Sequence, residues 1–189
     1  MTIRQEIANR VAQLLQDGCV IIDLETTGMS DDPDVQIIEV AIIDQQGNVL
    51  INTLVRPQGF IPAGASRVNN IYDADVADKP TWPEVYPQVA EILTNRVAVA
   101  YNSTFEEAVL NAVCRRHNLP PIRPREWWCP MRAYQAYTGA TRYVRLTDAC
   151  AAEGIRVQNA HRALGDIRMT LALMQKMAEG AGPIQPSLF

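Results

Sequence analysis

Apolar residues recur at helical spacing over the first 17 residues of the chain. Ile3, Ile7, Val11 and Leu14 lie on one side of such a helix, and Gly18 follows directly. Apolar side chains three or four positions apart share a helical face, and glycine is common just past the end of a helix. The pattern predicts an amphipathic helix over residues 2–17 that covers the core.

Short apolar runs then predict strands. They read CVIIDL at 19–24, VQIIEVAIID at 35–44, NVLINTLV at 48–55 and RVAVA at 96–100, and the turn DQQGN joins the second and third as a hairpin. A turn-rich segment at 57–80 and a helix at 82–93 precede the fourth run. Further helices are predicted at about 103–117, 131–138, 146–153 and 162–178. Strands followed by alternating strand and helix predict an α/β fold with a mixed sheet covered by helices.

The composition indicates one ordinary globular unit. A chain of 189 residues with 48% hydrophobic residues suffices for one domain, expected over residues 1–180, and residues 181–189 are expected to form a flexible tail. No apolar run is long enough to span a bilayer, and the four cysteines lie far apart without a CxxC pair, which argues against a zinc site. We expect a soluble, cytoplasmic protein with reduced thiols.

Charge is distributed unevenly along the chain. Residues 1–95 carry 5 Lys or Arg against 14 Asp or Glu, whereas residues 96–189 carry 12 against 7. Nearly all the basic residues of the second half are arginines, which suit phosphate through paired hydrogen bonds. The net charge of −4 therefore does not exclude nucleic acid as a partner, although an ordinary solvated surface explains the distribution equally well.

Two acids stand at the end of the first apolar run. Residues two apart on a strand share a face, so Asp23 and Glu25 are expected side by side. Like charges held this close repel, and a divalent cation such as Mg²⁺ between them removes the repulsion. The same spacing also arises by chance, with Asp23 at a strand end and Glu25 capping a turn. The pair alone leaves both interpretations open.

Three segments together resemble the motifs of the DEDDh (DnaQ-like) 3'–5' exonucleases, which include bacterial proofreading exonucleases. They are DLETTG with QIIEVAIID, then AYNSTFEEAVL, then HRALGDIRMT. The resemblance covers roughly residues 18–178 and implies a ribonuclease-H-like α/β fold, with a mixed five-stranded sheet flanked by helices. It also implies removal of nucleotides from the 3' end of DNA, single-stranded or frayed, as nucleoside 5'-monophosphates. The implied cofactor is Mg²⁺ or Mn²⁺, two ions per site.

The motifs also imply the site residues. The implied catalytic set is Asp23, Glu25, Glu106, His161 and Asp166. The four acids of this set are the implied metal ligands, and the histidine is the implied general base. Glu106 departs from the family, which usually has Asp after the Phe of the second motif. The neighbouring Glu107 is a poorer substitute because one helical residue turns the side chain by about 100°.

The same resemblance implies contacts with the terminal nucleotide. They involve Leu24, Thr26, Thr27, Asn102 and Phe105. For Phe105, plain core packing is an equally good interpretation. Three arginines, Arg142, Arg145 and Arg162, are expected to contact phosphates.

Two other functions remain open at this level. One is an exoribonuclease that trims RNA 3' ends, because no motif here reads the 2'-hydroxyl unambiguously. The other is a nucleic-acid-binding module with a weakened nuclease. The only feature that favours it is the glutamate at position 106 in place of the usual aspartate. The pathway, whether proofreading, repair or end trimming, also stays open, and any polymerase or other machine is expected to act in trans.

The tail carries one more motif. QPSLF at 185–189 resembles the short peptide with which bacterial replication and repair proteins bind the sliding clamp. Gln185 offers a polar anchor, and Leu188 and Phe189 offer two apolar side chains. The alternative is that Leu188 and Phe189 fold back on the protein's own surface.

Overall fold

A mixed sheet forms the centre of the computed structural model, which describes residues 2–157 and 162–181. The strands lie in the order β3-β2-β1-β4-β5, with β1–β2 and β2–β3 antiparallel and β1–β4 and β4–β5 parallel. Their bounds are β1 Val20–Thr26, β2 Ile37–Asp44, β3 Val49–Leu54, β4 Val97–Val99 and β5 Glu126–Trp128. The predicted mixed five-stranded α/β sheet is therefore confirmed.

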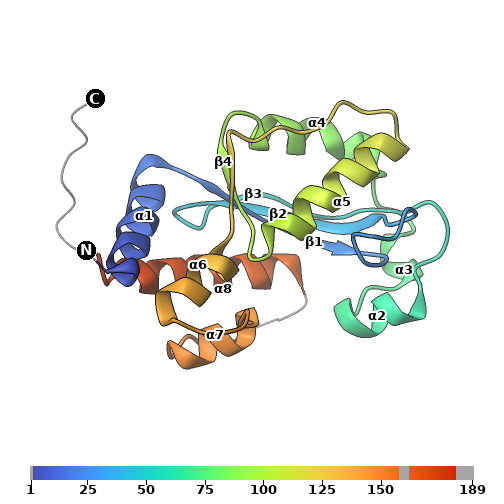
Figure 1. Ribbon diagram of the computed structural model, residues 1–189. Helices are drawn as coiled ribbons and strands as arrows, with labels where there is room; N and C mark the ends of the chain where they lie inside the picture. The colour runs from blue at the N-terminus through green and yellow to red at the C-terminus, as the bar shows by residue number, and fades with distance from the viewer. Residues whose placement is uncertain (1, 158–161, 182–189) are drawn as a thin grey trace.

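Helices cover both faces of this sheet (Figure 1). On one face lie α4 (Trp82–Leu93) and α5 (Ser103–Arg116), and on the other lie α1 (Ile3–Asp17), α6 (Pro130–Thr138), α7 (Leu146–Ala152) and α8 (Ala163–Ala178). Two short helices, α2 (Ala63–Asn69) and α3 (Asp73–Val76), lie beside the end of β1. None of the helices in the described ranges is both long and apolar enough to cross a membrane.

Strand β1 supplies both cores through its alternation. Val20, Ile22 and Leu24 pack with α4 and α5, whereas Ile21 packs with α1, α6 and α8. All four side chains are at most 5% exposed, and burying each contributes about 1.5–3 kcal/mol. Because successive side chains alternate, Asp23 and Glu25 continue the face of Ile21 toward α8.

Most of the expected elements are found near their predicted bounds. Helix α1 begins after Thr2, whose Oγ1 accepts from the backbone N–H of Gln5, and it ends at Gly18 with φ of 98°. A positive φ is readily adopted only by residues such as glycine.

The four cysteines are free thiols. The extent of the domain and the tail stays a prediction, since residues 182–189 lie outside the described part.

The sequence did not predict where two parts of the fold lie: the two short helices and the fifth strand. The turn-rich segment at 57–80 contains α2 and α3, which are too short to show helical periodicity. The fifth strand consists of three residues, and its two tryptophans lie on opposite faces, Trp127 against the α4–α5 core and Trp128 against the α8 core. A strand this short shows no alternation in the sequence that would distinguish it from a loop.

Candidate active site

Three of the expected acids meet at the end of β1. Asp23 and Glu25 come from the strand, and Asp166 comes from the first turn of α8. One carboxylate oxygen from each lies within 4.8 Å of the others. An all-oxygen donor set of this kind suits a hard divalent cation. The sheet and α8 thus bring together acids that are more than 140 positions apart.

Glu106 reaches the same site from α5. This helix begins directly after β4, the strand that pairs with β1, so its first turn lies beside the acids. Glu106 is only 4% exposed, and its Oε2 has no hydrogen-bond partner among the described residues. A buried oxygen without a partner is costly unless something satisfies it, and a bound cation would do so. Glu107 is exposed, as expected for the poorer substitute.

The pKa values show how strongly these acids interact. Burial, followed by the charges of Glu106, Glu25, Asp166 and Glu39, raises the pKa of Asp23 well above its usual range. Burial is likewise the main reason why the pKa of both Glu25 and Glu106 rises to about 8. The cluster therefore favours shared protons in the absence of metal, and divalent cations can take the place of those protons. The residues thus fit the implied metal.

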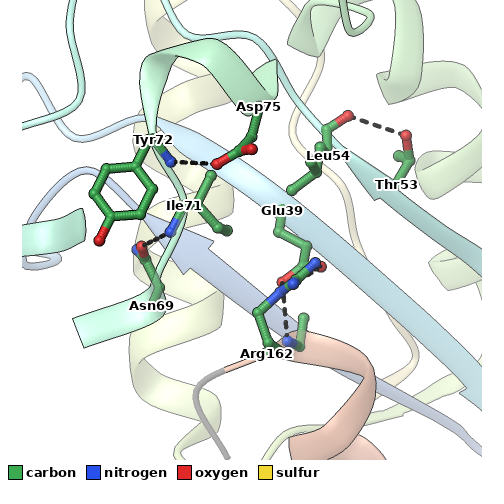
Figure 2. A network of polar contacts seen from close by, with 9 residues as sticks. Glu39, Thr53, Leu54, Asn69, Ile71, Tyr72, Asp75 and Arg162 are labelled. Atoms are coloured by element: carbon green, nitrogen blue, oxygen red, sulfur yellow. Dashed lines mark hydrogen bonds and ion pairs between the residues drawn. The ribbon is translucent and has the colours of Figure 1, made fainter. Parts of the chain in front are cut away.

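Glu39 is a further acid of this site that the sequence interpretation left without a role. It lies on β2 directly opposite Glu25 and is 3% exposed. Its Oε1 accepts from Nη2 of Arg162 at 2.8 Å, its Oε2 accepts from Nε of Arg162 at 3.1 Å, and Oε2 also accepts from the backbone N–H of Ala163 at 3.1 Å. Figure 2 shows this arrangement at the start of α8. The available signal was a charged residue within an otherwise apolar run.

The turn after β1 is held by hydrogen bonds of threonine and asparagine side chains together with the backbone. Thr27 donates its N–H to the carbonyl of Gln36 and accepts the N–H of Gln36 on Oγ1, both at 2.9 Å. Thr26 donates its hydroxyl to the carbonyl of Gly28 at 2.7 Å. Asn69, at the end of α2, donates its side-chain amide to the carbonyl of Thr26 at 3.5 Å. The segment expected to meet the terminal nucleotide is therefore fixed next to the acids.

The other expected contact residues differ in exposure. Leu24 is 5% exposed and packs in the α4–α5 core, on the face opposite Asp23. Phe105 is half-buried and packs against the same core, which agrees with the core-packing interpretation, whereas Asn102 is exposed at the start of α5. Nucleotide contacts by these three residues stay predictions. Of the three expected phosphate contacts, Arg162 is held by Glu39, and Arg142 and Arg145 are exposed.

The expected general base and the tail motif lie outside the described residues. His161 directly precedes Arg162, and Gln185, Leu188 and Phe189 belong to the segment 182–189. Their proposed roles rest on the sequence motifs.

Comparison with known proteins identifies the family. Residues 20–174 match the family model RNase_T, described as exonuclease. The chain belongs to this exonuclease family. The family match and the DEDDh motifs together identify the chain as a 3'–5' exonuclease of the DnaQ-like type. This family uses divalent metal ions.

Relatives and solved structures agree with this assignment. The chain is 34% identical over 187 residues to an uncharacterised exonuclease, CP81, of Escherichia phage 186, covering 92% of this chain and 95% of the relative. It is 30% identical over 159 residues to the DNA polymerase III subunit epsilon of Treponema pallidum (strain Nichols), and the alignment covers 82% of this chain and 74% of the relative. Exonuclease X, solved in complex with 5'-overhanging duplex DNA, aligns with a TM-score of 0.67 at 29% identity, covering 85% of this chain and 92% of that one.

Proposed function

We propose that this exonuclease removes nucleotides from the 3' end of DNA, single-stranded or frayed, and releases nucleoside 5'-monophosphates. The observation that carries the proposal is the acid cluster, in which oxygens of Asp23, Glu25 and Asp166 lie within 4.8 Å of one another. Beside them lies Oε2 of Glu106, which has no hydrogen-bond partner in the described part of the chain. These four acids would hold two Mg²⁺ or Mn²⁺ ions.

The residues divide the chemistry between them. Divalent ions bound here would lower the pKa of the attacking water and would stabilise charge on the phosphate and on the departing 3'-oxygen. The four acids would hold these ions. His161 would accept the proton of the water, because a neutral imidazole is suited to act as a general base. The backbone at Thr26 and Thr27 would hold the terminal nucleotide, together with the side chains of Leu24, Asn102 and Phe105.

DNA is favoured over RNA by the names of the similar proteins. One relative, 29% identical over 170 residues, is exodeoxyribonuclease 10 of Escherichia coli (strain K12), and exonuclease X was solved with duplex DNA. The Treponema relative is named as a subunit of a DNA polymerase, which supports action in trans with a polymerase. We propose that the enzyme acts in the cytoplasm. Its pathway would be proofreading, repair or end trimming.

The decisive experiment compares two labelled substrates. The protein is incubated with Mg²⁺ and either a 5'-labelled single-stranded DNA or an RNA of the same sequence. We expect the DNA to shorten stepwise from its 3' end, with no shortening in EDTA or with Asp166→Asn. Glu107→Gln, which changes an exposed acid, is the matched control. Degradation of RNA alone would assign an exoribonuclease, and binding without degradation would assign a nucleic-acid-binding module.

We also propose that the tail binds a bacterial sliding clamp. The support is the motif itself, with Gln185 and the pair Leu188-Phe189 behind a Gly- and Pro-containing segment. Tethering to a clamp would raise the local concentration of DNA ends for an enzyme of net charge −4. A labelled peptide of residues 180–189 is titrated against a sliding clamp. Binding that survives Leu188→Ala with Phe189→Ala, or no binding at about 100 μM, well above a micromolar docking affinity, would remove the proposal.

A further inference from the structure

We propose that a groove next to the acid cluster binds the phosphate backbone of the nucleic acid beyond its terminal nucleotide. The inference rests on the proposed function and assigns a second part of the substrate to a second surface. This arginine groove is a cavity of about 750 Å³, lined among others by Glu39, Asn52, Asn69, Arg156, Arg162 and Arg168.

The groove is built by elements from both halves of the chain. Residues at the end of α2 line it on one side, and α8 contributes Gly165, Arg168, Met169 and Ala172 on the other. These four positions recur at three- and four-residue spacing, so they form one face of the helix. The acidic first half and the arginine-rich second half of the chain thus meet at this groove.

The charge of the groove is positive. Its acid, Glu39, is neutralised by Arg162. Asp75, whose charge also acts on Arg162, is not among the residues that line the groove, and it accepts the backbone N–H of Tyr72 at 2.9 Å at the start of α3 (Figure 2). Arg156 and Arg168 are exposed, and neither forms a salt bridge within the described part of the chain. Two arginines therefore remain available to an anion.

The groove adjoins the acid cluster directly. Glu39 lines it and lies opposite Glu25 in the register of β1 and β2, and Asn69 lines it and bonds the carbonyl of Thr26. A strand whose 3' end lies at the acids therefore passes close to the groove. The acids repel phosphates that are not bound to metal, so a nearby pair of free arginines favours the following phosphates.

The lining fits a polyanion better than a small apolar ligand. Pockets for small molecules are mostly apolar with a few polar groups, whereas three arginines and three asparagines line this cavity. Arginine binds phosphate through its planar fork, and asparagine amides donate to phosphate oxygens. Phosphates of the cleaved strand and of a complementary strand share this chemistry.

The test combines Arg156→Ala with Arg168→Ala in the full chain. Binding of fluorescein-labelled single-stranded 20-mer and 20-base-pair duplex is measured by anisotropy without divalent metal, over a range of salt concentrations. Loss of two phosphate contacts should weaken binding on the order of 10-fold at low salt and reduce the salt slope by about 1 to 2. The matched control is Arg115→Ala with Arg123→Ala, which removes two exposed arginines elsewhere and should leave binding within twofold. Circular dichroism verifies the fold of both variants.

Catalysis gives a second readout with Mg²⁺. The KM for the 20-mer is divided by the KM for a dinucleotide, which is too short to reach past the acids. This ratio should rise when Arg156→Ala is combined with Arg168→Ala. Loss of binding to both probes assigns the groove to the cleaved strand, and loss confined to the duplex assigns it to the complementary strand. Unchanged binding and an unchanged KM ratio would overturn the proposal. A wild-type protein that binds DNA through these arginines but does not cleave it would leave the groove standing and remove the proposed nuclease.

Discussion

The carboxylate of Glu39 and the guanidinium of Arg162 form a two-pronged ion pair across 123 positions of the chain, with Nη2–Oε1 at 2.8 Å and Nε–Oε2 at 3.1 Å. The pair joins β2 to the residue that precedes α8, and the same carboxylate accepts the first N–H of that helix. Because α8 carries Asp166 in its first turn, this contact fixes one expected metal ligand relative to the two expected ligands on β1.

We expect Glu39→Gln to lower the free energy of unfolding by about 1–2 kcal/mol, because an amide keeps the shape but loses the charge-assisted hydrogen bonds. The expected loss in the free energy of unfolding is small because the side chain of Arg162 is 46% exposed, so solvent partly screens its charge. A double-mutant cycle with Arg162→Gln, followed by urea unfolding with Mg²⁺ present, isolates the pair. Additive effects of the two changes would show that the two side chains do not stabilise each other.

Stability of the metal-free protein should fall as pH rises from about 5 to above 8. The pKa values of Glu25 and Glu106 are raised to about 8 in the folded state, so the folded protein binds more protons than the unfolded chain across this range. Their contribution is complete below the unfolded pKa values and is lost as pH passes the folded ones. Thermal unfolding at several pH values, with and without saturating Mg²⁺, measures the slope. A slope that Mg²⁺ does not flatten would contradict metal binding by these acids.

Replacing Asp23 or Asp166 by Ala should abolish hydrolysis and leave the metal-free protein as stable as the wild type or more so. Each change removes an expected metal ligand and also relieves repulsion among clustered carboxylates. Activity and chemical unfolding are measured on the same preparations. Near-wild-type hydrolysis by either variant with Mg²⁺ or Mn²⁺ would exclude its acid from the metal site.

Glu106→Asp should retain or raise activity, since it restores the acid usual in the family, whereas Glu106→Gln should lose it. The side chain is buried, and one of its oxygens has no hydrogen-bond partner within residues 2–157 and 162–181, so its charge is expected to serve a bound ion. Glu107→Asp is the matched control, because that side chain is exposed one position further along. A complete loss of activity in Glu106→Asp would show that the site is built around the longer side chain.

His161→Ala should reduce the rate by about 10² or more, the usual contribution of a general base, while Mg²⁺ binding survives. The pH–rate profile of the wild type should rise through the titration of this imidazole, and that limb should disappear in the variant. Calorimetric titration with Mg²⁺ separates lost metal binding from lost proton transfer. An identical profile in the variant would assign the base to another group.

The sequence by itself determined the elements with strong local patterns and the acids within them. Helix α1 follows from apolar residues spaced three to four positions apart, and strands β1 to β3 follow from short apolar runs. Both patterns depend only on near neighbours in the chain. The motif acids Asp23, Glu25 and Asp166 were found because their spacing within each motif is local. The same local information distinguished Glu106 from Glu107, whose exposures differ as helical geometry requires.

The tertiary structure decided everything that depends on which segments pack together. Glu39 is one charge in an apolar run until α8 lies against β2 and places Arg162 beside it. Strand β5 has three residues, and it is a strand because β4 offers it hydrogen bonds. The arginine groove exists only where α2 and α8 lie on the two sides of the same cavity. Such contacts join residues that lie between 29 and 123 positions apart in the chain. Their energies come from burial and charge pairing that no local pattern records.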